Sequence, residues 1–248
     1  RVLINDYAEL ENNFREQLNK FNKKALNNTP LTDKEFERVL NILNGKSVLQ
    51  SAIKLREKID FDREDGTKIY LKLLSENAED NIYQVSNQIT VQGKYKNRYD
   101  VTILINGLPL VQIELKRSGI DINEAINQID RYRIHSYRGL FHYIQIYVVS
   151  NSVETRYFAN TDAQRLLKSL TFYWTTETNE RINKLEDFSS SFFNKARLLK
   201  NITRYMVINE TDKNLIVMRP YQIYATEALI RHALDTGKNG YIWHTTGS

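Results

Sequence analysis

Two short apolar segments joined by Asn106-Gly107 constrain the fold more than any other part of the sequence. Residues 101–105 and residues 108–113 are almost entirely apolar, and Asn-Gly is typical of the tight turn of a β-hairpin. Strands that are apolar along their whole length, rather than at every second residue, are buried on both faces. The sequence therefore predicts a hairpin that lies inside the protein.

Charged residues lie at the ends of these two apolar segments. Asp100 precedes the first segment, while Glu114 and Lys116 end the second and, two residues apart on a strand, share one face. Carboxylates on neighbouring strands can hold a divalent cation, which activates water and stabilises charge on a phosphate, while the lysine orients the water. The triplet predicts a metal-dependent nuclease site. The alternative is that these are solvated charges on an amphipathic hairpin.

The register of the hairpin decides whether these carboxylates can meet. A plain two-residue loop pairs Asp100 with Ile113, on the face opposite to Glu114. A three-residue loop over residues 105–107 pairs Asp100 with Gln112 instead, diagonal to Glu114 on one face. We therefore expect an odd-length loop or a β-bulge in this hairpin.

The rest of the chain alternates between helix and strand signals. Thr32 and Glu35 have the spacing of a capping box, and Ser47 is a candidate helix cap. Apolar periodicity predicts helices at residues 7–21, 33–42, 47–55, 121–137, 163–170, 185–207 and 219–234, and strands at 68–74, 83–91, 99–105, 110–115, 144–149, 156–159 and 240–244.

Composition excludes several classes of protein. The chain has no cysteine, which rules out disulfides, cysteine-based zinc sites and thiol nucleophiles. Its 35 Lys and Arg against 30 Asp and Glu give a net charge of +5, which permits nucleic-acid binding without proving it.

With no apolar run near ~20 residues and no signal-peptide core, we expect a soluble intracellular protein that has no membrane partner. At about 150 residues per domain, the length predicts one large domain, or one domain and part of another.

A second group of candidate residues follows the hairpin. Gln128 and Tyr132 are four residues apart and share a helix face, from which an amide and a hydroxyl can reach a DNA phosphate; the alternative is ordinary packing. Basic residues nearby could bind DNA phosphates, or could simply be solvated surface. They are Lys94, Lys96, Arg98, Arg117, Arg131 and Arg133.

The C-terminal residues resemble the start of a nucleotide site. An expected strand leads into Thr245-Thr246-Gly247-Ser248, as a strand leads into a phosphate-binding loop. The Gly-Lys-Ser/Thr that completes such a loop does not follow. We therefore expect no productive ATP binding by this chain.

Taken together, the sequence closely resembles the N-terminal part of the restriction (motor and nuclease) subunit of type I restriction–modification systems, the HsdR family. The resemblance rests on residues 5–6, 10–13, 95–102, 105–117, 127–133, 171–174, 209–213, 219–222 and 239–248. It implies an α/β fold of the RecB-like PD-(D/E)xK nuclease class: a mixed central sheet flanked by helices, an N-terminal helical region and the start of a RecA-like helicase domain.

The resemblance also assigns roles to residues of the nuclease site. Asp100, Glu114 and Lys116 match the catalytic triplet of the family, and Leu115 would offer its carbonyl to the metal. Tyr99 replaces the nominal proline of the motif.

The remaining motifs match the family as well. Gln128 and Tyr132 match its Q-x-x-x-Y motif, associated with DNA contact. Gln222 matches the glutamine that recognises adenine in superfamily 2 helicases, and residues 244–248 match the start of Walker A, with His244 in place of glycine.

The implied organisation is an endonuclease domain over residues 1–205, with a helical part at 1–60 and a nuclease core at 61–175. A linker and the truncated start of a superfamily 2 motor follow at 206–248.

The implied activity is Mg²⁺-dependent cleavage of double-stranded DNA, coupled in the full subunit to ATP-driven translocation. The implied partners are methyltransferase and specificity subunits in a prokaryotic cytoplasm. The family cleaves only in its assembled complex, so the activity of the isolated chain stays open. The alternative is a catalytically silent DNA-binding or docking module of a helicase-like protein.

Overall fold

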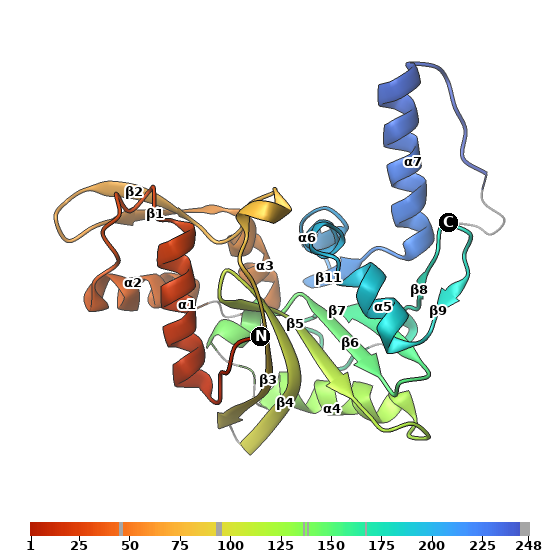
Figure 1. Cartoon of the computed structure of the whole chain (residues 1–248), viewed down its shortest axis with the longest axis horizontal. Coiled ribbons are helices and arrows are strands. Elements are labelled where there is room, and N and C mark those ends of the chain that lie inside the picture. Colours follow the sequence, from red (N-terminus) through yellow and green to blue (C-terminus); the bar gives the residue numbers. More distant parts are fainter. Residues whose placement is uncertain (45–46, 93–95, 136, 138, 167, 244–248) are drawn as a thin grey trace.

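A five-stranded mixed sheet lies at the centre of the computed structural model (Figure 1), which describes residues 1–44, 47–92, 96–135, 137, 139–166 and 168–243. Its strands, in spatial order, are β3 (Tyr83–Gln92), β4 (Lys96–Ile105), β5 (Leu108–Leu115), β6 (Ile146–Ser150) and β7 (Thr155–Ala159). Only β5 and β6 are parallel; the other neighbours are antiparallel. The predicted mixed α/β class is therefore confirmed.

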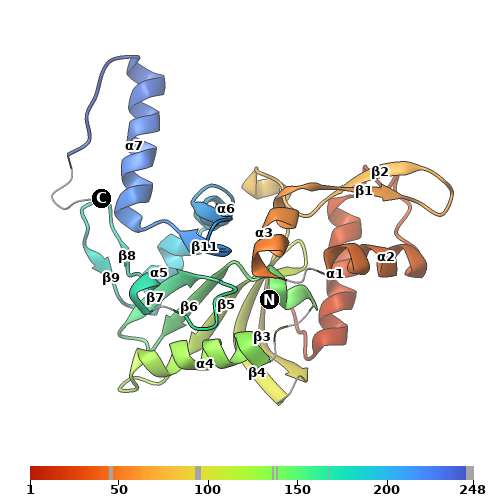
Figure 2. The ribbon, with the colours of Figure 1, turned by 180° about the vertical axis from the view of Figure 1, so that it is seen from behind.

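Helices and small hairpins surround this sheet. The N-terminal helices and the β1–β2 hairpin lie at one end, α4 runs along the sheet, and α7 projects from the other end (Figures 1 and 2). The α-helices in the described residues are α1 (Tyr7–Phe21), α2 (Asp33–Leu43), α3 (Val48–Arg56), α4 (Ile122–His135), α5 (Leu185–Phe192), α6 (Lys195–Thr203) and α7 (Pro220–Thr236). The outer hairpin strands are β1 (Lys58–Asp62), β2 (Lys68–Lys72), β8 (Trp174–Thr175), β9 (Arg181–Ile182), β10 (Met206–Asn209) and β11 (Asn214–Val217). Short 3-10 turns span Ala78–Asp80, Gly139–Tyr143 and Lys168–Leu170.

Two predicted helix starts are confirmed by their caps. The Thr32 side chain accepts a hydrogen bond from the Glu35 N–H, and the Glu35 carboxylate accepts one from the Thr32 N–H, which is a complete capping box. The Ser47 side chain caps α3 by accepting from the Gln50 N–H. These local bonds satisfy N–H groups that a helix start leaves without partners.

Some predicted elements are wrong. The helix predicted over residues 185–207 is interrupted because the Asn194 side chain accepts hydrogen bonds from two following N–H groups and starts α6 anew. The end of that range is strand β10. In place of the helix predicted over residues 163–170, residues 163–165 form bends and Lys168–Leu170 form a 3-10 turn. In the described chain residues 240–243 pair with no strand. Residue 244 lies outside the described residues.

The β4–β5 hairpin has a two-residue turn and a bulge. Ile105 pairs with Leu108, which contradicts the three-residue loop, and Leu104 pairs with Pro109. Ile103 then pairs with Val111, so Leu110 is an extra residue in β5. This bulge shifts the register by one residue, as the alternative expectation required.

Further along the hairpin, Thr102 pairs with Gln112, and Val101 pairs with Ile113. The pairing predicted between Asp100 and Gln112 is therefore wrong. Asp100 and Glu114 instead follow the pair Val101 and Ile113, so they lie opposite each other at the end of the hairpin.

The turn of this hairpin is locked into the protein. Asn106 and Gly107 have φ values of 52° and 81°, the left-handed region that a tight hairpin turn requires. The buried Asn106 side chain donates to the Leu73 carbonyl and accepts from the Ile82 N–H, at 2.9 and 2.8 Å. A Cβ atom on Gly107 would lie 2.7 Å from the Phe14 Cα of α1. The hairpin therefore cannot move independently of the N-terminal helices.

A buried ion pair joins α2 to the turn that follows β1. Arg63 donates two hydrogen bonds to the Glu35 carboxylate, at 3.1 and 3.0 Å, and others to backbone carbonyls of the α1–α2 loop. The hydrogen bonds from Arg63 lower the pKa of Glu35 from 4.5 to about 2, against the opposing effect of burial.

Within the described residues, none of the helices has the length and apolar character that crossing a lipid bilayer requires.

Gly107→Ala should lower the free energy of unfolding by about 2–3 kcal/mol, since the substitution adds backbone strain and a clash with α1. Gly66→Ala is the matched control, because Gly66 has nearly the same φ of 83° but no atom within 4 Å of the added Cβ. Urea unfolding of both variants measures the difference. Equal losses in the two variants would show that contact with α1 is unimportant.

Glu35→Gln should lower the free energy of unfolding by about 3 kcal/mol near neutral pH, because it leaves the Arg63 charge buried without its carboxylate. The folded pKa of Glu35 lies below its usual 4.5. The stabilisation is therefore complete above pH 4.5 and is lost as pH falls towards 2. Unfolding titrations from pH 2 to 7 test this, with the exposed Glu37→Gln as control. A deficit that does not shrink with falling pH contradicts the assignment.

Candidate active site

The carboxylates of Asp100 and Glu114 meet where β4 and β5 stop pairing. Asp100 Oδ2 accepts a hydrogen bond of 2.8 Å from the Leu115 N–H, which fixes the Asp100 side chain against β5. Asp100 also acts electrostatically on Glu114. The two carboxylates therefore lie together, which the register argument from the sequence required of a metal site.

Glu114 is a buried acid in an unfavourable environment. The residue is 1% exposed, and within the described chain its Oε2 receives no hydrogen bond. Burial first, and then the negative charge of Asp100, raise the pKa of Glu114 from 4.5 to about 7, while Lys116 opposes this rise. A buried carboxylate is retained at such a cost chiefly at functional sites.

Lys116 links the carboxylates to α4. Its Nζ donates a 3.0 Å hydrogen bond to Glu114 Oε1 and another to the Gln128 side-chain oxygen. The Gln128 amide in turn donates to the Tyr132 hydroxyl. Tyr132 is buried, and its ring packs edge-on against Tyr99 with centroids 4.9 Å apart. The two α4 residues thus hold Lys116 in place from inside the protein.

The donor set at this site fits a magnesium ion. Mg²⁺ is bound in proteins through one or two carboxylates and keeps several waters. Asp100 and Glu114 supply two carboxylates, and the buried Glu114 Oε2 has a free acceptor position. Among the described residues no group of three or more His, Asp or Glu gathers to hold a metal.

An open groove of about 580 Å³ adjoins Lys116. It is lined by Arg117 and Ile120 from the loop after β5 and by Asn127 and Arg131 from α4. Arg117 and Arg131, two of the predicted basic residues, therefore lie in the groove that adjoins Lys116.

The other basic residues are placed differently. Arg98 is exposed on β4. Arg133 instead lies with its side chain 7% exposed and donates to Asp130 and to the Thr161 carbonyl, both at 2.8 Å. Lys94 and the side chain of Lys96 lie outside the described residues.

Of the candidate ATP residues, the structure describes Gln222 alone. Gln222 lies in the first turn of α7, where its side-chain oxygen accepts a 3.0 Å hydrogen bond from the Arg219 N–H. Thr245, Thr246, Gly247 and Ser248 lie outside the described residues.

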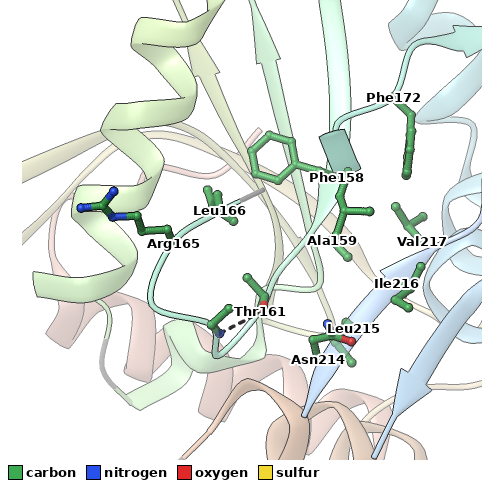
Figure 3. A pocket seen from close by; sticks show the side chains of 12 residues that line it. Phe158, Ala159, Thr161, Arg165, Leu166, Phe172, Asn214, Leu215, Ile216 and Val217 are labelled. Carbon is green, nitrogen blue, oxygen red and sulfur yellow. Dashed lines mark hydrogen bonds between the residues drawn. The ribbon is translucent and has the colours of Figure 1, made fainter. Parts of the chain in front are cut away.

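A separate apolar cavity between β7 and β11 (Figure 3) has a volume of only about 40 Å³, far below the roughly 300 Å³ of a small-molecule site.

Comparison with known proteins identifies the family. The family model for the "Type I restriction enzyme R protein N terminus" (HSDR_N) matches residues 3–166. The chain belongs to this family of type I restriction enzyme R proteins.

Curated HsdR relatives agree with this assignment. The type I restriction enzyme SauCOLORF180P endonuclease subunit of Staphylococcus aureus (strain COL) is 56% identical over 249 residues, covering 100% of this chain and 27% of the relative. The EcoprrI endonuclease subunit of Escherichia coli is 41% identical over 238 residues, covering 92% of this chain and 74% of the relative. The chain therefore spans about a quarter of the length of the staphylococcal relative.

The sequence analysis missed one contact of the site and did not use one signal for the bulge that it expected as an alternative. The bond from Lys116 to Gln128 joins residues on different elements, and no local pattern predicts it. The bulge did have a signal, because Pro109 lies in a central strand, where proline is tolerated essentially only at bulges.

Glu114→Gln should raise the free energy of unfolding at pH 8 in EDTA by about 1–2 kcal/mol, because it removes a buried charge. The raised pKa means that ionised Glu114 destabilises the folded chain, increasingly from pH 4.5 to 7 and fully above that. Glu124→Gln, exposed on α4, is the control and should change stability by less than about 0.5 kcal/mol. A less stable Glu114→Gln variant would contradict this account.

Proposed function

We propose that this chain is the endonuclease domain of a type I restriction enzyme R subunit, with a PD-(D/E)xK site that hydrolyses DNA phosphodiester bonds in a Mg²⁺-dependent reaction. The observation that supports this most is that the buried Glu114 carboxylate lies beside the Asp100 carboxylate and accepts a hydrogen bond from Lys116. A solvated amphipathic hairpin would not bury Glu114. The basic groove beside Lys116 supports a polyanionic substrate.

Each residue has a distinct role in this proposal. Asp100 and Glu114 hold the metal through carboxylate oxygens, with the Leu115 carbonyl as a further ligand. A bound Mg²⁺ supplies Lewis acidity to the phosphate and lowers the pKa of water. Lys116 orients the attacking water or neutralises phosphate charge, and Gln128 fixes the position of its ammonium group.

The wider proposal concerns the full subunit. There, α7 begins a RecA-like superfamily 2 motor in which Gln222 contacts adenine and residues 245–248 begin the ATP phosphate loop. ATP-driven translocation delivers double-stranded DNA to the nuclease site. Methyltransferase and specificity subunits complete the complex in a prokaryotic cytoplasm. The names of the relatives, which are type I endonuclease subunits, support this assignment.

Asp100→Ala and Lys116→Ala in the reconstituted full complex should each reduce DNA cleavage by at least ~100-fold, since each removes a group needed in the transition state. ATPase and translocation rates should remain at the wild-type level, because the motor residues are untouched. Cleavage of circular DNA and ATP hydrolysis are measured on the same preparation. Normal cleavage by either variant would refute the assignment.

Calorimetric titration with Mn²⁺ separates a nuclease from a silent DNA-binding module. The wild-type chain should bind the metal, and Glu114→Ala should abolish that binding. Glu124→Ala is the control, because Glu124 is exposed in the groove beside the site. Metal binding that is unaffected by Glu114→Ala would favour the silent module.

A further inference from the structure

A tyrosine between two arginines forms a compact cationic feature beyond the candidate active site. The guanidinium carbons of Arg156 and Arg181 lie 4.6 and 4.5 Å from the centroid of the Tyr173 ring. Arg156 donates a 2.7 Å hydrogen bond to the Tyr173 hydroxyl, which donates a 2.6 Å bond to Glu154. We call Arg156, Tyr173 and Arg181 the Arg–Tyr–Arg stack.

The register of the sheet aligns this stack with the carboxylates. Glu114 of β5 pairs with Val149 of β6, and Val149 pairs with Arg156 of β7. Residues paired in this way point to the same face of a sheet. Two strand spacings separate Glu114 from Arg156, roughly 10 Å at 4.8 Å per spacing.

Positive charge continues from the site towards the stack. The Asn123 N–H is the main cause that lowers the pKa of Asp121, at the start of α4, and the charges of Lys168 and Arg156 lower it further. These cations therefore lie near the loop that joins the groove at Arg117 to α4.

Arg181 is the available cation of the stack. Arg156 forms a 2.6 Å ion pair with Glu154, whereas no described carboxylate lies within ion-pair distance of the exposed Arg181. Stacking on a ring covers one face of a guanidinium and leaves its N–H edge free to bind phosphate oxygens in pairs. It also restricts the side chain in advance, which lowers the entropy cost of binding.

We propose that the Arg–Tyr–Arg stack binds the backbone of the same DNA duplex whose phosphodiester lies at the carboxylates. This inference rests on the proposed nuclease function and extends it. Arg181 is then a positioning residue: it holds the duplex in register with the carboxylates without touching the reacting atoms.

The test measures DNA affinity rather than cleavage. A duplex of about 30 base pairs is titrated with the 248-residue chain across a range of salt concentrations. Arg181→Gln should weaken binding several-fold at low salt and reduce the slope of log K against log salt by about 0.9, the value of one phosphate contact. Arg181→Lys should keep the salt slope but lose part of the affinity, since it keeps the charge without the planar fork.

Lys58→Gln is the matched control. Lys58 is an exposed cation on β1, and β1 and β9 lie towards opposite ends of the molecule (Figure 1), so both the affinity and the slope should stay at wild-type values. An unchanged slope in Arg181→Gln overturns the inference, as does an equal loss in Lys58→Gln. Neither result affects the nuclease proposal, which depends on cleavage by Asp100 and Lys116 variants in the full complex.

Discussion

One extra residue in β5 determines where the charged groups of this protein meet. Without the bulge at Leu110, the two-residue Asn106-Gly107 turn would place Asp100 beside Ile113 and point its side chain away from Glu114. With the bulge, both acids reach the same end of the hairpin. The side chains of Asp100 and Glu114 share one face of the hairpin because of this single insertion. The proposed chemistry therefore depends on the strand register, which brings the two acidic side chains together.

The site also places a buried carboxylate next to a second negative charge, and both burial and repulsion disfavour its ionised form. Glu114 is buried beside a second carboxylate, and among the described residues Lys116 is the cation that compensates for its charge. In the proposed site, a bound cation would compensate both acids, including Glu114 Oε2, which receives no hydrogen bond among the described residues. The surrounding apolar strands supply the stability that makes this arrangement tolerable.

Local signals in the sequence predicted local structure well. The caps at Thr32 and Ser47 and the Asn106-Gly107 turn depend on residues a few positions apart, so their chemistry is visible in the sequence. The break at Asn194 was hidden, because a favourable apolar pattern continues across it. The Lys116–Gln128 bond and the row from Glu114 to Arg156 join distant segments, and they follow from tertiary packing that no short pattern records.

The contact between Gly107 and α1 has a practical consequence for engineering. Hairpin turns are usually good places to insert a tag, a fluorophore or a second domain. The β4–β5 turn is closed to such insertions, because any added atom meets the backbone of Phe14. The turn between β1 and β2 has open space around Gly66 and lies far from the carboxylates. A reporter placed there would leave the strand register of the β4–β5 hairpin untouched.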